Sequence, residues 1–371
     1  MKTCFFTSCL CVAMLCAGQL TGQSYQIYVS DARNFQNPPW QILKFDADGQ
    51  NGQVFIDTHL AWPQDIFFLE KENKVLISNL NNGRISTFNA GTGAFIGEFA
   101  TGIGGPTRMS LGPDSLLYVL QWSGNGKVRR YSLTGNYLGE FTQVGVNTSI
   151  GLDWDQAGNL YVSSYNGKHI RKFGPDGADL GLFISANLAG PTNIWFADNG
   201  DLMVIDYNGG AVKRFDAQGN YLGVFISSLP QGEGVAFLPD SNLLIGVGGE
   251  SAVRKYTASG VLLGNLIAPG TLNLLTPNAV VLRPQSATPV QEIYEDITLV
   301  KPNLGQQFQW QSAASDLKQV FLYNHSGVLM RTLTFTDSTY WDASDLPAGV
   351  YHLHAKLTDG RMGKQTIVIA R

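Results

Sequence analysis

The sequence predicts an all-β chain in which a six-bladed β-propeller, closed by a C-terminal strand, is followed by a small β-sandwich-like domain. Three observations lead to this expectation. Charged residues make up only 15% of the chain, while it contains 42 glycines and 11% aromatic residues, a composition typical of β structure with tight turns. A unit of about 40 residues recurs six times. The first unit lacks its first strand, and a surplus strand follows the sixth.

One aromatic position marks each repeat, and successive positions are 41 to 43 residues apart: Phe45, Phe88, Tyr131, Phe173, Phe215 and Tyr256. Residues 190–227 show the whole unit as four short apolar or β-branched runs separated by turns. Asn-Gly and Asp-x-x-Gly in these turns supply positive φ angles. Four strands repeated radially in this way form the blades of a propeller.

The ends of the repeat predict how the ring closes. Residues 25–32, YQIYVSDA, match the second strand of a blade, whereas residues 276–284, TPNAVVLRP, match a first strand. We therefore expect the first blade to combine both ends of the repeat region, which leaves no open sheet edge at the junction. The predicted propeller spans residues 23–284.

The repeat resembles the NHL family over about residues 25–284. The family pattern is carried in one blade by Pro191, Gly200, Val204, Asp206 and Phe215. The resemblance implies a six-bladed propeller. It does not select a function, because this fold hosts binding proteins, lyases and lactonases alike.

The N-terminus is typical of a secretory signal peptide. Lys2 precedes an apolar run over residues 4–17, and small residues follow, so we expect residues 1–22 to be removed. All four cysteines lie in this segment, which leaves no cysteine for disulfides, zinc thiolates or a nucleophile in the mature chain. No later stretch is long and apolar enough to predict a transmembrane segment.

The net charge of −4 and a pI near 5.7 provide no basic field for nucleic acid. We therefore expect no nucleic-acid partner.

The C-terminal region follows a different pattern. Residues 285–299 form a predicted polar linker, and residues 300–371 contain their own strands, including a hairpin around residues 324–327. This region resembles the type A sorting domain of the type IX secretion system of Bacteroidota. The matching residues are Pro302-Asn303, Val320, Leu322-Tyr323, Gly327, Leu346-Pro347-Ala348-Gly349, Tyr351, Lys364 and Arg371. Leu304 departs from the pattern, which usually has a second proline there.

The resemblance implies export through the periplasm to the cell exterior or the outer-membrane surface, with the type IX machinery as a partner. An immunoglobulin-like appendage is the alternative interpretation.

Candidate site residues come from aligning the blades. The starts of the inner strands are aligned as Asp65, Arg108, Gly151, Asn193, Gly234 and Asn278. Aromatic residues follow the second strands of three adjacent blades at Trp122, Tyr165 and Tyr207. Together with Arg108, Asn193 and Asp206, they predict a channel face that binds a glycan, peptide or protein by stacking and hydrogen bonding. The alternative is structural, because Asp or Asn at a strand end often closes a turn.

An enzymatic alternative is a metal-dependent lactonase or esterase similar to the six-bladed gluconolactonase-like family. Its calcium or magnesium ligands would be Asp65, Asn193, Asp206 and Asn278, which carry the hard oxygen donors that these ions prefer. The early Glu-Gly-Pro of that family is absent, and Arg108 would place a positive charge beside the cation. We therefore predict a binding or scaffold propeller with no catalytic residue and no cofactor.

Overall fold

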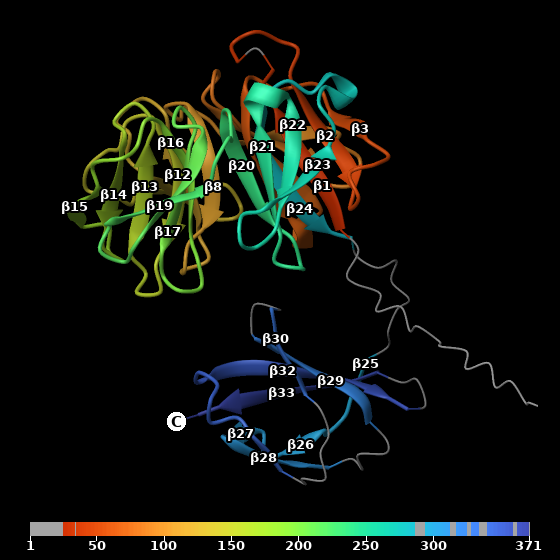
Figure 1. Cartoon of the computed structure of the whole chain (residues 1–371). Coiled ribbons are helices and arrows are strands. Elements are labelled where there is room, and N and C mark those ends of the chain that lie inside the picture. Colours follow the sequence, from red (N-terminus) through yellow and green to blue (C-terminus); the bar gives the residue numbers. More distant parts are fainter. Residues whose placement is uncertain are drawn as a thin grey trace, which may run out of the picture. The chain divides into compact units, whose positions relative to one another are not determined.

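The structure is a computed structural model that describes residues 25–33, 35–285, 294–311, 317–324, 328–333, 340–358 and 362–370. The predicted signal peptide and residues 286–293 of the predicted linker lie outside the described residues. The chain divides into two compact units, Met1–Gln285 and Ser286–Arg371 (Figure 1).

The first unit contains six four-stranded antiparallel sheets, which are the six blades. The first strands of the blades are β24 (Pro277–Pro284), β4 (Pro63–Leu69), β8 (Pro106–Leu111), β12 (Ser149–Trp154), β16 (Pro191–Phe196) and β20 (Gly232–Phe237). The second strands are β1 (Tyr25–Asp31), β5 (Lys74–Asn79), β9 (Leu117–Gln121), β13 (Leu160–Ser164), β17 (Leu202–Asp206) and β21 (Leu243–Val247). The first strands contact one another in succession and close a ring, from β4 through β24 and back to β4, so they line the channel.

The outer half of each blade is equally regular. The third strands are β2 (Gln41–Asp46), β6 (Arg84–Asn89), β10 (Arg129–Tyr131), β14 (His169–Phe173), β18 (Ala211–Phe215) and β22 (Ala252–Tyr256). The fourth strands are β3 (Gln53–Ile56), β7 (Phe95–Ala100), β11 (Tyr137–Glu140), β15 (Asp179–Ile184), β19 (Tyr221–Ile226) and β23 (Leu262–Ile267). Among the described residues, three short 3-10 helices lie between strands: η1 (Glu70–Glu72), η2 (Gly248–Glu250) and η3 (Thr271–Asn273).

The predicted closure is confirmed. Strand β24 pairs antiparallel with β1 from Tyr25 opposite Pro284 to Asp31 opposite Pro277, which completes a sheet in the order β24-β1-β2-β3. Segments about 250 residues apart therefore form one blade, shown where the teal β24 lies beside the orange-red β1 (Figure 1).

Packing between blades explains the repeat. The six aromatic residues that mark it are at most 3% exposed, and each belongs to an apolar cluster shared with a neighbouring blade. A glycine in the turn after each third strand lies against the preceding blade. A Cβ there would come within 1.9–2.9 Å of a backbone carbonyl oxygen of that blade, and the backbone φ is positive: Gly49, Gly93, Gly135, Gly177, Gly219 and Gly260. Only glycine meets both conditions without strain.

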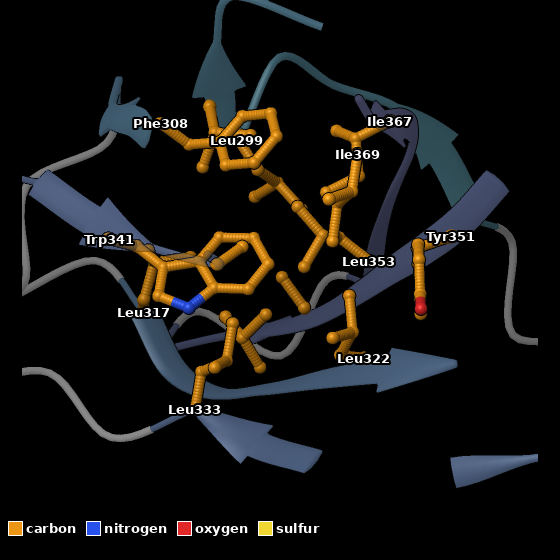
Figure 2. Close-up of a cluster of buried hydrophobic side chains, with 14 of the residues drawn as sticks. Leu299, Phe308, Leu317, Leu322, Leu333, Trp341, Tyr351, Leu353, Ile367 and Ile369 are labelled. Atoms are coloured by element: carbon orange, nitrogen blue, oxygen red, sulfur yellow. The ribbon is translucent and has the colours of Figure 1, made fainter. Parts of the chain in front are cut away.

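The second unit is a small β-sandwich. One sheet contains β25 (Tyr294–Asp296), β33 (Met362–Ile369), β32 (Gly349–Leu357), β29 (Leu317–Asn324) and β30 (Leu329–Leu333), with β27 (Leu304–Gly305) paired to β33. The other sheet contains β26 (Val300–Lys301), β28 (Gln307–Trp310) and β31 (Tyr340–Asp342). Side chains from both sheets meet in one buried core, in which the rings of Phe308 and Trp341 stack 5.2 Å apart (Figure 2). The all-β fold class predicted for the whole chain is thus confirmed.

The Leu-Pro-Ala-Gly-x-Tyr segment of this unit has a local structural explanation. Leu346 is buried in the core, and the hydroxyl of Tyr351 donates a hydrogen bond of 2.9 Å to the carbonyl oxygen of Pro347. The predicted hairpin forms between β29 and β30. Residues 325–327 of its loop, including Gly327 of the sorting-domain pattern, lie outside the described residues.

Within the ranges that the structure describes, no helix has the length and apolar character needed to cross a bilayer.

Candidate functional site

Two rings of residues, one position apart along the inner strands, surround the channel. In every blade the first residue of the inner strand pairs with the last residue of the second strand, as Pro191 does with Asp206 and Pro277 with Asp31. The second residues form a ring that we call the mouth ring: Gln64, Thr107, Ile150, Thr192, Glu233 and Asn278. The third residues form the middle ring: Asp65, Arg108, Gly151, Asn193, Gly234 and Ala279.

This register corrects the sequence alignment at one position. Asn278 was aligned with Asn193, but Asn278 belongs to the mouth ring, and Ala279 is its neighbour in the middle ring. The reason is that Pro277, and not Thr276, opens the closing strand. The sequence alignment had assigned only Gly234 of this strand to the channel. The register shows that Glu233, the second residue of β20, faces the channel as well.

Arg108 spans the channel. Its Nε donates to Oδ1 of Asn193 at 2.8 Å, and its Nη2 donates to Oε1 of Glu233 at 3.0 Å. The guanidinium also donates to the backbone carbonyls of Gln64 and Asn278. Arg108 thus links its own blade to four others, and its buried charge is offset by Glu233 and by an ion pair of 3.8 Å with Asp65.

The two buried carboxyls beside Arg108 have shifted pKa values. Burial raises the pKa of Glu233 to about 7; the Arg108 charge opposes this shift and the Asp65 charge adds to it. Burial likewise raises the pKa of Asp65, against the effect of Arg108 and of hydrogen bonds from the amides of Met109 and Ile66. Desolvation disfavours the charged form of both groups.

A pocket of about 230 Å³ lies at the mouth ring. Its aromatic lining forms two groups, Phe35 with Trp62, whose ring centroids are 5.2 Å apart, and Trp122 with Tyr165 and Tyr207. The centroids of Trp122 and Tyr165 are 5.8 Å apart, and those of Tyr165 and Tyr207 are 5.9 Å apart. Leu80 and Ile150 add apolar surface.

The polar part of this lining comes from Gln64, Thr192, Glu233 and Asn278 of the mouth ring. Three buried polar atoms of the pocket residues have no hydrogen-bond partner within the described part of the chain: Trp62 Nε1, Gln64 Nε2 and Asn278 Oδ1. Buried polar groups are nearly always paired, so three unpaired atoms on residues that line one pocket indicate partners from outside the chain, namely water or a bound ligand.

The structure brings some of the predicted site residues together and separates others. Trp122, Tyr165 and Tyr207 line the pocket, whereas Arg108 and Asn193 lie in the middle ring. Asp206 is completely buried away from the pocket lining. Its carboxylate accepts hydrogen bonds from the amides of Ala189 and Gly190 and pairs with Lys213 at 2.6 Å.

Sequence reasoning missed Phe35, Trp62, Gln64 and Glu233. Aligning the blades on the residue that opens each inner strand would have identified Gln64 and Glu233. Trp62 directly precedes the residue that opens its inner strand, a position that Gly, Thr or Gln occupies in the other blades, and Phe35 lies in the loop between β1 and β2. Neither aromatic residue recurs from blade to blade, so the period carries no signal for them.

The four residues assigned to the metal alternative do not form one site. Asp65 and Asn193 both bind Arg108, Asn278 lies in the other ring, and Asp206 closes a loop. No cluster of three or more His, Cys, Asp or Glu side chains suited to a metal occurs among the described residues. A guanidinium at the centre of the donor set does not fit a divalent cation there.

A larger groove of about 700 Å³ lies between the blade of β16–β19 and the blade of β20–β23. Trp195 and the half-exposed Phe237 form an edge-to-face pair in it, with centroids 5.7 Å apart. Its lining shares no residue with the mouth pocket.

No family model matches the sequence, and no curated protein matches it. Among solved structures, a chain from the crystal structure of a nidogen/laminin complex is similar, with a TM-score of 0.57 and 13% identity; the match covers 70% of this chain and 98% of that one. A protein of unknown function from Bacteroides caccae has a TM-score of 0.56, also at 13% identity, with the same coverage of both chains.

A gluconolactonase-like protein has a TM-score of 0.49 at 17% identity, and the match covers 57% of this chain and 79% of that one. The first two similarities show that the first unit shares its β-propeller fold with known proteins.

Proposed function

We propose that this chain is an exported binding propeller whose mouth pocket receives a small organic group displayed by a glycan, a peptide or a protein. The observation that carries the proposal is an aromatic-lined pocket with three unpaired polar atoms among its lining residues. Aromatic rings supply contact area, and a few placed polar atoms orient the ligand.

The distribution of charge supports binding over catalysis. Glu233, which lines the pocket, and Asp65 of the middle ring are both held by the Arg108 guanidinium. That arrangement uses Asp65 and one oxygen of Glu233 to join blades, so the parts of the pocket left for a ligand are the rings, the unpaired polar atoms and the second carboxyl oxygen of Glu233.

The termini support export. Residues 1–22 have the pattern of a signal peptide, and residues 300–371 resemble a type IX sorting domain. These features support the proposal that the chain acts outside the cell or on the outer-membrane surface, with the type IX machinery as its export partner.

The binding proposal is tested with the mature chain, residues 23–371, labelled and applied to glycan and peptide arrays. Replacing both Trp122 and Tyr207 by alanine should abolish the signals of the wild type, because it removes two walls of the pocket. Phe237→Ala is the matched control, since it removes a half-exposed aromatic ring from the separate groove. Array signals that survive the double substitution would refute the proposal, provided that both variants retain the wild-type melting temperature.

A further inference from the structure

The dimensions of the mouth pocket restrict what can enter it. At about 230 Å³ it is smaller than the roughly 300–1,000 Å³ typical of sites for drug-sized ligands. Its volume suits a single ring. The neighbouring aromatic rings are inclined to one another, at 42° between Trp122 and Tyr165 and 72° between Tyr165 and Tyr207. Aromatic walls inclined in this way can surround a ligand ring of appreciable thickness. They do not form the two parallel faces of a slot for a flat ring.

The polar atoms of the pocket include both hydrogen-bond donors and acceptors. Trp62 Nε1 and Gln64 Nε2 are donors, and Asn278 Oδ1 is an acceptor, all without a partner in the described ranges. Only Oε1 of Glu233 is occupied by Arg108, which leaves a second carboxyl oxygen at the pocket. A hydroxyl group satisfies both kinds of atom, because it donates one hydrogen bond and accepts others.

Charged ligands fit this lining poorly. A cation would find the Glu233 carboxyl of the lining already paired with the Arg108 guanidinium at 3.0 Å, and the positive charge of Arg108 opposes a second cation at that carboxyl. An anion would meet the Glu233 carboxyl and the Asn278 oxygen. A purely apolar side chain would leave the three polar atoms buried and unpaired, which is unfavourable.

We infer that the mouth pocket binds one neutral, polyhydroxylated ring, namely a single hexopyranose residue such as the end of a glycan. This inference rests on the proposed function and narrows it to one ligand class. Ring C–H faces pack on aromatic side chains while the hydroxyls pair with Trp62, Gln64, Asn278 and Glu233.

The test uses saturation-transfer NMR and calorimetry on the mature chain. The probes are the methyl hexopyranosides of glucose, galactose and mannose, with tetramethylammonium, acetate and N-acetylphenylalaninamide as the charged and apolar alternatives. At least one glycoside should bind, and Trp122→Ala should weaken its binding tenfold or more. Phe237→Ala should leave the affinity unchanged.

A second variant separates ligand binding from folding. Gln64→Met keeps the volume of the side chain and removes the unpaired donor, so the melting temperature should stay the same or rise. Glycoside affinity should fall by up to about tenfold, the effect of losing one neutral hydrogen bond.

The outcomes distinguish the two proposals. Binding of another probe that depends on Trp122, with no glycoside bound, would overturn the sugar inference and leave the proposed site intact. Glycoside binding that survives Trp122→Ala but is lost in Phe237→Ala would overturn both. If no glycoside binds while the arrays still give signals dependent on Trp122 and Tyr207, the inference is wrong and the proposed function stands.

Discussion

Replacing Arg108 by methionine should destabilise the propeller strongly at pH 8 and much less at pH 5. The arginine side chain is only 7% exposed and joins four other blades across the channel. Methionine fills much of its volume but leaves the carboxyls of Glu233 and Asp65 buried without a counter-charge.

The size of the effect follows from that loss. Removing one partner of a buried ion pair costs about 3–5 kcal/mol, because the other charge stays desolvated. For a domain of this size each kcal/mol lowers the melting temperature by roughly 2–4 °C, so a decrease on the order of 10 °C is expected at pH 8.

The pH dependence follows from the direction of the pKa shifts. The pKa of Glu233 is raised from 4.5 to about 7, so between these values the folded protein binds a proton that the unfolded chain has lost. The stability that this proton provides is present at low pH and is lost as pH rises through this window. Without Arg108 the pKa values of both carboxyls should rise further, so a larger share of this pair is protonated at pH 5 than at pH 8 and the penalty is smaller there.

Differential scanning calorimetry at pH 5 and pH 8 measures this directly and separates the propeller transition from that of the second unit. The double variant Arg108→Met with Glu233→Gln should recover part of the loss at pH 8, because it removes one of the stranded charges. A difference between wild type and Arg108→Met that is absent, or equal at the two pH values, would refute the role assigned to Arg108.

Three further predictions concern closure, export and metal. A chain ending at Gly270 should melt far below one ending at Gln285, because β24 pairs with β1 along its length; equal melting by circular dichroism would contradict the closed ring. Deleting residues 300–371 in the native host should hold the propeller in the periplasm, and its appearance in the medium by immunoblot would rule out the sorting role. Millimolar calcium should change the melting temperature of the wild type by less than about 1 °C, because Arg108 occupies the centre of the candidate donor set; a clear rise would revive the metal alternative.

The blades and their closure could be predicted because each repeat position meets the same physical requirement six times. The turn glycines illustrate this, since each combines positive φ with a close approach to the preceding blade. The aromatic group of Trp122, Tyr165 and Tyr207 was predictable for the same reason, because these residues follow equivalent strand ends. Their proximity follows from the radial arrangement of adjacent blades.

The rest of the site could not be predicted from the period, because it depends on contacts that cross the ring. Arg108 and Glu233 are 125 residues apart, and Arg108 reaches the carbonyl of Asn278 over 170 residues. The repeat period predicts which residues face the channel. It does not predict which side chain reaches across the channel to other blades. The sequence therefore predicted Arg108 as a ligand-binding residue whose charge would repel a cation, whereas the structure pairs it with two carboxyls across the channel.

That pairing also connects the scaffold to the pocket. Arg108 holds Glu233 through its side chain and Gln64 and Asn278 through their carbonyls, and all three belong to the mouth ring. The residue that ties the blades together thus also fixes three polar residues that line the pocket. Because both roles depend on one guanidinium, a change at Arg108 that lowers the melting temperature should weaken ligand binding as well, even though Arg108 does not line the mouth pocket.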